Sequence, residues 1–204
     1  MRVLVACEFS GIVRDAFAAR GHDAWSCDLL PTERPGQHYQ RFVQDVIPQR
    51  EWDLMIAHPP CTYLCRSGQR WLTNPDGTKN GERWAHMILA CEFFNELLDA
   101  PIKRIAVENP MMHTHARQRI RKHDQIVQPW EFGHPETKAT CLWLKGLPPL
   151  FVTVMAQGRE GRVHGESPSK NRGKTRSVTY QGIADAMAAQ WGGDECDDWV
   201  GDAR

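Results

Sequence analysis

The sequence has no excess of charge of either sign, no long apolar run and no paired cysteine framework. Its 25 basic and 25 acidic residues cancel, so the charge balance does not by itself indicate a nucleic-acid-binding protein. No stretch is apolar for long enough to cross a bilayer, and the chain starts on an apolar run without the pattern of a secretory signal. The 7 cysteines are odd in number and scattered, which favours reduced thiols in a cytoplasmic protein without membrane attachment.

The length of 204 residues, 41% of them apolar, suits one well-buried core. We therefore expect a single domain over residues 1–204 that acts as a monomer. Two segments depart from the even charge, a basic one within residues 151–176 and an acidic tail at residues 194–204. The basic segment is a candidate for phosphate contact, although such a run is more often a solvated surface.

Short apolar runs alternate with amphipathic helical patterns along the chain. Strands are predicted at residues 3–6, 24–28, 53–57, 102–107 and 140–144, and helices after Ser10-Gly11, over residues 84–98 and over residues 183–191. This alternation is typical of an α/β fold with a mostly parallel sheet and helices on both faces. Ligands of such sheets bind beyond the carboxyl ends of the strands. Chemistry-bearing residues stand at these predicted ends: Glu8, Asp28, Asp45, Cys61 and Glu108.

The clearest strand end is the run His58-Pro59-Pro60-Cys61, which directly follows the predicted strand 53–57. Two consecutive prolines must end the sheet pairing there. The polar stretch that follows, residues 62–81, is too long for a simple connection, and it is predicted to be a mobile functional loop. A cysteine is commonly a small core residue, but the prolines before Cys61 and the polar loop after it favour an accessible thiol.

In their order along the chain, these strand-end residues resemble motifs of the DNA cytosine carbon-5 methyltransferases. Glu8-Phe9-Ser10-Gly11-Ile12 is similar to that family's Phe-x-Gly-x-Gly signature, with Val13 and Arg14 where further glycines are usual. Pro60-Cys61 resembles the family's Pro-Cys motif, with Thr62 in place of the usual glutamine. Glu108-Asn109-Pro110 resembles its Glu-Asn-Val motif. The resemblance spans most of the chain.

Two later segments continue the resemblance. Residues 132–140 are similar to a family segment in which a glutamine and two arginines alternate after Gly-x-Pro, and those places hold Glu136, Lys138 and Thr140. Residues 179–184 loosely match the closing motif that completes the donor pocket. The basic segment 151–176 occupies the place of a much larger target-recognition domain, so we expect a short sequence preference and mainly phosphate contacts.

The resemblance implies a Rossmann-like class I S-adenosylmethionine-dependent methyltransferase fold in a compact, phage-like form. It implies transfer of a methyl or modified methyl group to cytosine carbon 5 from S-adenosylmethionine, or from a carboxylated or otherwise modified analogue. The cytosine would be flipped out of DNA or single-stranded, because a stacked base is out of reach.

Specific roles follow from the same resemblance. Cys61 would add to carbon 6 of the base, Glu108 would hold N3 and the exocyclic amine, and Lys138 would donate to the carbonyl. Asp28 would accept hydrogen bonds from the ribose hydroxyls, and Asp45 would contact the adenine. The full set of expected donor contacts is Glu8, Phe9, Ser10, Gly11, Asp28, Leu29, Asp45, Val46 and Pro59. No metal ion is expected.

Three other interpretations stay open. His58-Pro59-Pro60-Cys61 superficially resembles the Asp-Pro-Pro-Tyr motif of methyltransferases that act on adenine N6 or cytosine N4. A non-catalytic relative that only binds DNA or the donor would explain the altered glycine motif. Cys61, Cys65 and His58 are close enough in sequence for a zinc site, although no second ligand pair is present at metal-site spacing. Arg14 either favours an extra carboxylate on the donor or faces solvent.

Overall fold

The computed structural model describes residues 1–161 and 177–193. The acidic tail and most of the basic side chains of segment 151–176 therefore lie outside the described residues. The described chain contains a seven-stranded sheet in the order β3-β2-β1-β4-β5-β7-β6. Its strands are β1 (Arg2–Ala6), β2 (Asp23–Asp28), β3 (His38–Gln40), β4 (Leu54–Ala57), β5 (Arg104–Pro110), β6 (Gln125–Val127) and β7 (Thr140–Lys145).

Strands β1 to β5 are parallel, and β7 runs antiparallel to both of its neighbours, β5 and β6. This strand order is that of the Rossmann-like class I S-adenosylmethionine-dependent methyltransferase fold, so the predicted fold class is confirmed. The order reverses at β1, which lies between β2 and β4. Open α/β sheets bind their ligands beyond the strand ends at such a switch point, which directs attention to the ends of β1 and β4.

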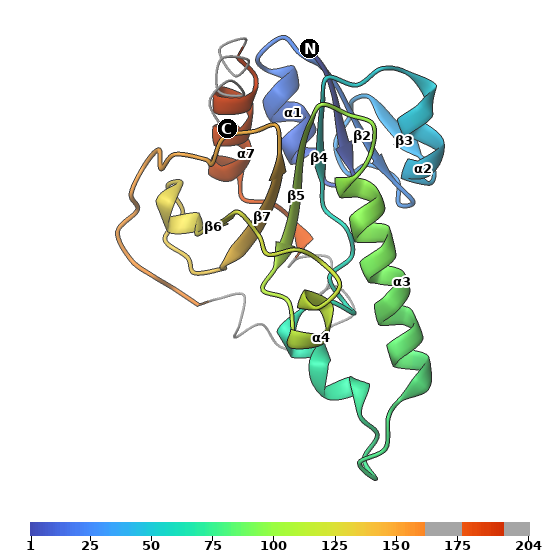
Figure 1. Ribbon diagram of the computed structural model, residues 1–204. Helices are drawn as coiled ribbons and strands as arrows, with labels where there is room; N and C mark the ends of the chain where they lie inside the picture. Colours follow the sequence, from blue (N-terminus) through green and yellow to red (C-terminus); the bar gives the residue numbers. More distant parts are fainter. Residues whose placement is uncertain (162–176, 194–204) are drawn as a thin grey trace, which may run out of the picture.

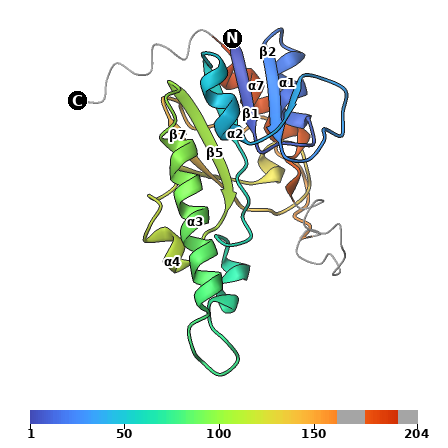
Figure 2. The ribbon, with the colours of Figure 1, turned by 90° about the vertical axis from the view of Figure 1, so that its right-hand side faces the viewer.

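Helices cover both faces of the sheet. Figure 1 and Figure 2 show α1 and α7 together on one face and α3 along the other. The helices are α1 (Ile12–Ala18), α2 (Val43–Val46), α3 (Gly81–Leu98), α4 (Thr114–Arg117) and α7 (Gln181–Trp191), with 3-10 helices at Ile47–Gln49, Arg66–Leu72 and Pro129–Glu131. Over residues 1–161 and 177–193, no helix has both the length and the apolar character needed to span a bilayer.

Alternate residues of the central strands supply two hydrophobic cores. In β1, Leu4 packs in the core under α3, whereas Val3 and Val5 pack in the core under α1 and α7. All residues of β4 are completely buried, as expected for a parallel strand that is covered on both faces. The continuous apolar runs of the sequence predicted these two strands correctly for this reason.

The structure corrects two details at the edge of the sheet. The strand predicted to stop at Val107 continues as β5 to Pro110, because Glu108, Asn109 and Pro110 pair with β7. Glu108 is therefore held in the sheet instead of standing in a loop beyond it. The short strands β3 and β6 were not predicted.

Residues 62–80, predicted to be a mobile loop, contain ordered structure. They include the 3-10 helix Arg66–Leu72 and a tight turn that is closed by pairing of Thr73 with Lys79. Together with the first turns of α3 they form an arm that projects from the body of the molecule (Figure 1, Figure 2). We call residues 62–86 the arm below.

Gly182, in the first turn of α7, permits a close contact with the segment that leads to β7. Its N–H donates to Nε2 of His134 at 2.9 Å, and a Cβ at this position would overlap the carbonyl oxygen of Phe132. Gly81, at the start of α3, has no heavy atom within 4 Å of its would-be Cβ. The two glycines therefore form a matched pair for substitution.

We predict that Gly182→Ala lowers the free energy of unfolding by about 1–3 kcal/mol, because backbone atoms must move to admit the methyl group. Gly81→Ala should leave it unchanged or raise it by up to about 1 kcal/mol. Thermal unfolding of both variants measures this, since 1 kcal/mol corresponds to roughly 2–4 °C in a chain of this size. Equal melting temperatures for the two variants would contradict the packing argument.

Candidate functional site

The adjacent ends of β1, β4 and β5 bring several predicted site residues to one edge of the sheet. Glu8 directly follows β1 after Cys7, and the N–H of His58 donates to the carbonyl of Ala6 at 2.9 Å. Ala57 of β4 is in register with Val107 of β5, so the next residues, His58 and Glu108, are neighbours across the two strands. Cys61 follows three residues later. The structure thus places Glu8, Cys61 and Glu108 at the same edge.

Glu8 caps helix α1 from inside the fold. Its carboxylate accepts hydrogen bonds from the N–H groups of Val13 at 2.7 Å and Arg14 at 3.3 Å, and from Ser10 Oγ at 3.2 Å. The side chain is 5% exposed, and burial raises its pKa above the usual value. Glu8 therefore holds the turn that contains Phe9, Ser10 and Gly11, and its carboxylate oxygens point into the protein.

Arg14 is completely buried and does not face solvent. Its guanidinium donates to Ser26 Oγ and Thr32 Oγ1, to the carbonyls of Arg34 and Pro35, and to the carboxylate of Asp15. These acceptors use all five guanidinium donors. Gly11, whose φ is 74°, leaves the space that this guanidinium fills, because a Cβ there would lie 2.5 Å from Arg14 Nη2.

The residues predicted to hold the ribose and adenine lie around the end of β2. Asp28 Oδ1 accepts from the N–H of Leu30 at 2.9 Å, and the side chain of Leu29 is 57% exposed. Asp45 is exposed on α2, whereas the side chain of Val46 is completely buried. Asp28, Leu29 and Asp45 are therefore accessible for a ligand, and the Val46 side chain is not.

Cys61 lies in a tight turn with a second cysteine. The carbonyl of Cys61 accepts from the N–H of Leu64 and of Cys65, each at 3.0 Å, which brings Cys65 one helical turn beyond it. The two thiols form a hydrogen bond that lowers the pKa of Cys65 and raises the pKa of Cys61. The hydroxyl of Ser67 and the N–H of Gly68 also stabilise a Cys65 thiolate.

Glu108 is buried against His58. His58 Nδ1 lies 2.8 Å from Glu108 Oε2, and each side chain is 11% exposed. Thr179 Oγ1 donates to the same carboxylate oxygen at 3.2 Å. Burial opposes ionisation of Glu108, yet its pKa is lowered by the hydrogen bond and charge of His58, by Lys138 and by Thr179.

Lys138 lies close enough to act electrostatically on both Glu108 and Cys61, and it favours the ionised form of each. Its Nζ donates to the carbonyl of Val178 at 3.3 Å and lies 5.6 Å from the centre of the Tyr180 ring. The three predicted catalytic residues are therefore close enough for the charge of Lys138 to act towards a lower pKa of both Cys61 and Glu108.

The residues on either side of Lys138 face the protein. Glu136 Oε2 accepts from the hydroxyl of Tyr180 at 2.5 Å. Thr140 is buried, and its hydroxyl donates to the carbonyl of Lys138 at 3.2 Å. These two contacts fix the backbone that carries Lys138.

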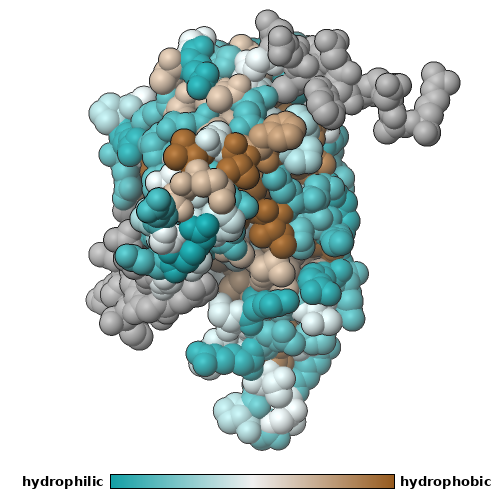
Figure 3. All heavy atoms as spheres, turned by 90° about the vertical axis from the view of Figure 1, so that its left-hand side faces the viewer, coloured by the Kyte–Doolittle hydropathy of each residue, from teal (hydrophilic) through white to brown (hydrophobic). Residues whose placement is uncertain are grey.

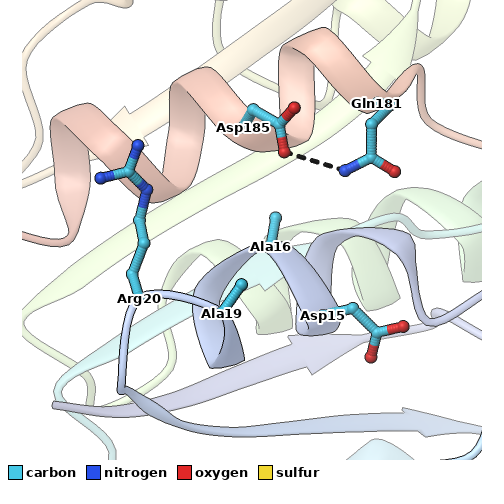
Figure 4. Close-up of a pocket in the computed structure, with 6 residues that line it drawn as sticks. All are labelled: Asp15, Ala16, Ala19, Arg20, Gln181 and Asp185. Atoms are coloured by element: carbon cyan, nitrogen blue, oxygen red, sulfur yellow. Dashed lines mark hydrogen bonds between the residues drawn. The ribbon is translucent and has the colours of Figure 1, made fainter.

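Two hollows differ in their relation to this edge. One of about 40 Å³ is lined by residues of the β1–α1 turn, by His58 and by residues that precede α7, namely Cys7, Glu8, Phe9, Ser10, Ser177, Val178 and Thr179. The other, of about 540 Å³, lies between α1 and α7 and is lined by Asp15, Ala16, Ala19, Arg20, Gln181 and Asp185 (Figure 4). The second hollow is larger, but it is lined by none of the strand-end residues, so we assign the site to the first.

The arm carries cations stacked on aromatic rings. The guanidinium of Arg70 lies 4.6 Å from the Trp71 ring centre, and that of Arg83 lies 4.3 Å from the Tyr63 ring centre. Trp71 is 54% exposed. Positive charge next to exposed aromatic surface is the combination that binds single-stranded nucleic acid or unstacked bases.

The described part of segment 151–176, residues 151–161, exposes several apolar side chains. Phe151, Val154 and Met155 are each at least 60% exposed, and Figure 3 shows brown apolar patches on the face that it presents. Arg159 stacks on Trp130, with its guanidinium carbon 3.8 Å from the ring centre. The basic residues from Arg162 onward lie outside the described residues.

Three contacts of the site were missed in the sequence. His58 and Thr179 both contact Glu108, and Cys65 contacts Cys61. The spacing of Cys65 four residues after Cys61 was a usable signal, because a turn after the prolines brings residues four apart together. In the part of the chain that the structure describes, no group of three His, Cys, Asp or Glu side chains is arranged to hold a metal ion.

Comparisons with known proteins leave the family open. No family model matches the chain, and neither does any curated protein. Among solved structures the chain is similar to a crystal structure of a candidate DNA modification methyltransferase that is encoded within an E. coli prophage. The TM-score is 0.44 at 17% identity, over 76% of this chain and 51% of the other. The chain thus spans about half the length of that protein, and a likeness this distant adds no weight to any function.

Proposed function

We propose that this protein is a DNA methyltransferase that transfers a methyl-type group from S-adenosylmethionine, or a close analogue, to carbon 5 of cytosine. The observation that carries the proposal is the placement of Cys61 beyond the end of β4 and of Glu108 in the adjacent strand β5, with Lys138 acting on both. A nucleophile and an acid that flank one flat ring are what addition to a pyrimidine requires.

Carbon 5 of cytosine is a poor nucleophile because the ring is aromatic, so the ring must first be activated. Cys61 gives its thiol proton to the adjacent Cys65 thiolate, its Sγ adds to carbon 6, and the electrons of the C5–C6 double bond move to carbon 5. Glu108 stabilises the charge that develops at N3, and Lys138 donates to the carbonyl oxygen. Once carbon 5 carries the new group, its proton passes to solvent, the C–H electron pair restores the C5–C6 double bond, and Cys61 Sγ leaves carbon 6 as a thiolate.

The residues around β1 and β2 fit the donor. Asp28 offers carboxylate oxygen to ribose hydroxyls, and the exposed apolar surface of Leu29 beside it suits a flat purine. The 40 Å³ hollow next to His58 would receive part of the amino-acid tail, near Ser10 and Thr179. When bound, the donor supplies an electrophilic methyl-type carbon. Because all donors of Arg14 have protein acceptors, Arg14 gives no support to an extra carboxylate on the donor.

DNA is the proposed macromolecular substrate, and the arm is the described surface that suits it best. The Arg70–Trp71 and Arg83–Tyr63 pairs lie in the chain that continues from Cys61. A cytosine must leave the helical stack to reach a thiol at a strand end, and an exposed tryptophan with adjacent cations suits the unstacked strand.

One rival activity is disfavoured by a particular contact. In an amino-methyltransferase, the first residue of the His58-Pro59-Pro60-Cys61 run would hold the target amine. Here that residue, His58, is turned inward and paired with Glu108 at 2.8 Å. An amine acceptor is therefore missing from its expected place, and Cys61 would have no role.

The covalent step gives the decisive test. On DNA in which 5-fluorocytosine replaces cytosine, the wild-type protein and donor should form an adduct that survives denaturation, because fluorine at carbon 5 blocks the final elimination. Cys61→Ser should form none. Cys91→Ala, which changes a buried thiol in α3, is the control and should form the same adduct as the wild type.

Denaturing electrophoresis measures the adduct, and mass spectrometry of nucleosides from unmodified DNA identifies the product. A 5-substituted cytosine is expected. An adduct formed by Cys61→Ser would remove Cys61 from the mechanism, and an N-methylated base without any adduct would replace the proposal by amino-group transfer.

The thiol pair predicts an unusual order of reactivity towards iodoacetamide. In the free wild-type protein Cys65 should be alkylated first, since Cys61 donates to its thiolate and keeps its own proton. In Cys65→Ser, Cys61 should react at lower pH than in the wild type, because the neighbouring negative charge is gone. Cys91 and Cys141 are internal controls, because burial raises the pKa of each to about 11.

Peptide mass spectrometry after alkylation at several pH values reads out both thiols. Preferential alkylation of Cys61 in the wild type at neutral pH would show that the hydrogen bond does not order the two ionisations. If the alkylation of Cys61 has the same pH dependence in Cys65→Ser as in the wild type, the hydrogen bond likewise does not order the two ionisations.

A further inference from the structure

His58 is placed where it acts on Glu108 from inside the protein. It follows β4 at the position next to Glu108 of β5, and its Nδ1 lies 2.8 Å from Glu108 Oε2. Thr179 donates to the same oxygen. Both contacts are made by Oε2 of Glu108, and neither of them uses Oε1.

The surroundings favour a protonated imidazole despite its burial. Burial opposes the charge, but the hydrogen bond and charge of Glu108, together with the charge of Glu8, raise the pKa of His58, while Lys138 acts in the opposite sense. Nε2 of His58 is buried without a hydrogen-bond partner among the described residues. His58 also lines the 40 Å³ hollow, which it shares with Glu8.

A buried ion pair of this kind is weak evidence for stability. Removing two charges from water costs several kcal/mol per ion, and their attraction often only offsets that cost. Glu108 already accepts from Thr179, and β5 is held by pairing on both sides. The sheet therefore does not require an imidazole here, and a role in the chemistry explains it better.

We propose that His58 is a positioning residue that stores the proton which Glu108 delivers to N3 of the target cytosine. The inference rests on the proposed function and deepens it. His58 contacts no substrate atom in this scheme and works only through Glu108.

In the resting pair His58 is an imidazolium and Glu108 a carboxylate. As the Cys61 thiolate adds to carbon 6, the Nδ1 proton of His58 moves to the Glu108 carboxylate, and the carboxyl group so formed gives a proton to N3, which has gained electron density. Glu108 is again a carboxylate. His58 is then neutral. When the Sγ–C6 bond breaks, N3 returns its proton to Glu108 and Nδ1 recovers its own.

His58→Asn separates proton storage from simple orientation. The Asn side-chain amide can donate to Glu108 Oε2 from about the position of Nδ1, but it cannot release a proton at neutral pH. We expect kcat for cytosine modification to fall about 10²-fold or more, with KM for DNA little changed. His123→Asn, which changes a histidine that packs on Trp143, should leave kcat unchanged.

The pH profile gives a second readout that a structural role would not move. Wild-type kcat should fall as pH rises through the raised pKa of His58, because the stored proton is lost there. This basic limb should be absent from His58→Asn, while the acidic limb set by the two cysteines should remain. Melting temperatures of the variants establish that each one is folded.

A third readout needs no substrate. In the free protein, imidazole resonances from ¹⁵N-labelled histidine should show His58 with a pKa above its usual value, and Glu108→Gln should lower it. A His58 that is neutral below pH 6 in the wild type would overturn the inference.

Failure of this inference is distinguishable from failure of the proposed function. If the wild type forms the 5-fluorocytosine adduct and His58→Asn keeps wild-type kcat and the basic limb, only the role of His58 is overturned. If the wild type forms no adduct, the proposed function itself fails, and the inference fails with it.

Discussion

The register between β4 and β5 is the constraint on which the site depends. Ala57 is paired with Val107, and both are completely buried, so the backbone at these strand ends is fixed by the core of the domain. The residues that follow on the two chains, His58 and Glu108, must therefore be neighbours, and their side chains are in contact. One residue farther, Asn109 Nδ2 donates to the carbonyl of Pro59 at 2.8 Å. This hydrogen bond holds the Pro-Pro-Cys turn against β5 and so helps to position the backbone of Cys61.

Charged groups around this edge are neutralised in different ways, and the differences indicate their roles. Glu8 is satisfied by backbone N–H groups and a hydroxyl, which suits a structural cap for α1. Arg14 is satisfied mainly by carbonyls and hydroxyls, which suits a structural tie. Glu108 is instead satisfied by a titratable partner, His58, and by the nearby charge of Lys138. Of these three groups, Glu108 is the one paired with a titratable side chain, and it lies in β5, next to the strand that leads to Cys61.

The sequence predicted those parts of the structure that depend on local pattern. Continuous apolar runs predicted β1 and β4, and helical periodicity predicted α3 and α7. An element that is buried on one or both faces needs apolar residues at regular positions, and this pattern is visible in the sequence. The strands β3 and β6 have three residues each, which is too short for a recognisable pattern. The antiparallel direction of β7 depends on how it pairs with β5 and β6 and not on its own residues.

The same division holds for the site. Cys61 follows the end of β4, and Glu108 directly follows the apolar run of β5 inside that strand, so both positions follow from where the apolar runs stop. His58 was visible as a residue, yet its partner lies 50 positions away, and only the strand register shows that the two side chains meet. The contact of Thr179 with Glu108 spans 71 positions and depends on how α7 packs, which no local pattern predicts.

The altered glycine motif has a physical explanation in the structure. Gly11 keeps the left-handed backbone and the free space that the turn requires, but within the chain this space admits the guanidinium of Arg14. Arg14 in turn binds the carbonyls of Arg34 and Pro35, which fastens the loop after β2 onto the turn after β1. A motif that elsewhere relies on several glycines is here built from one glycine and one buried cation. Since every donor of that cation is used within the protein, Arg14 acts as a structural residue that joins these two turns.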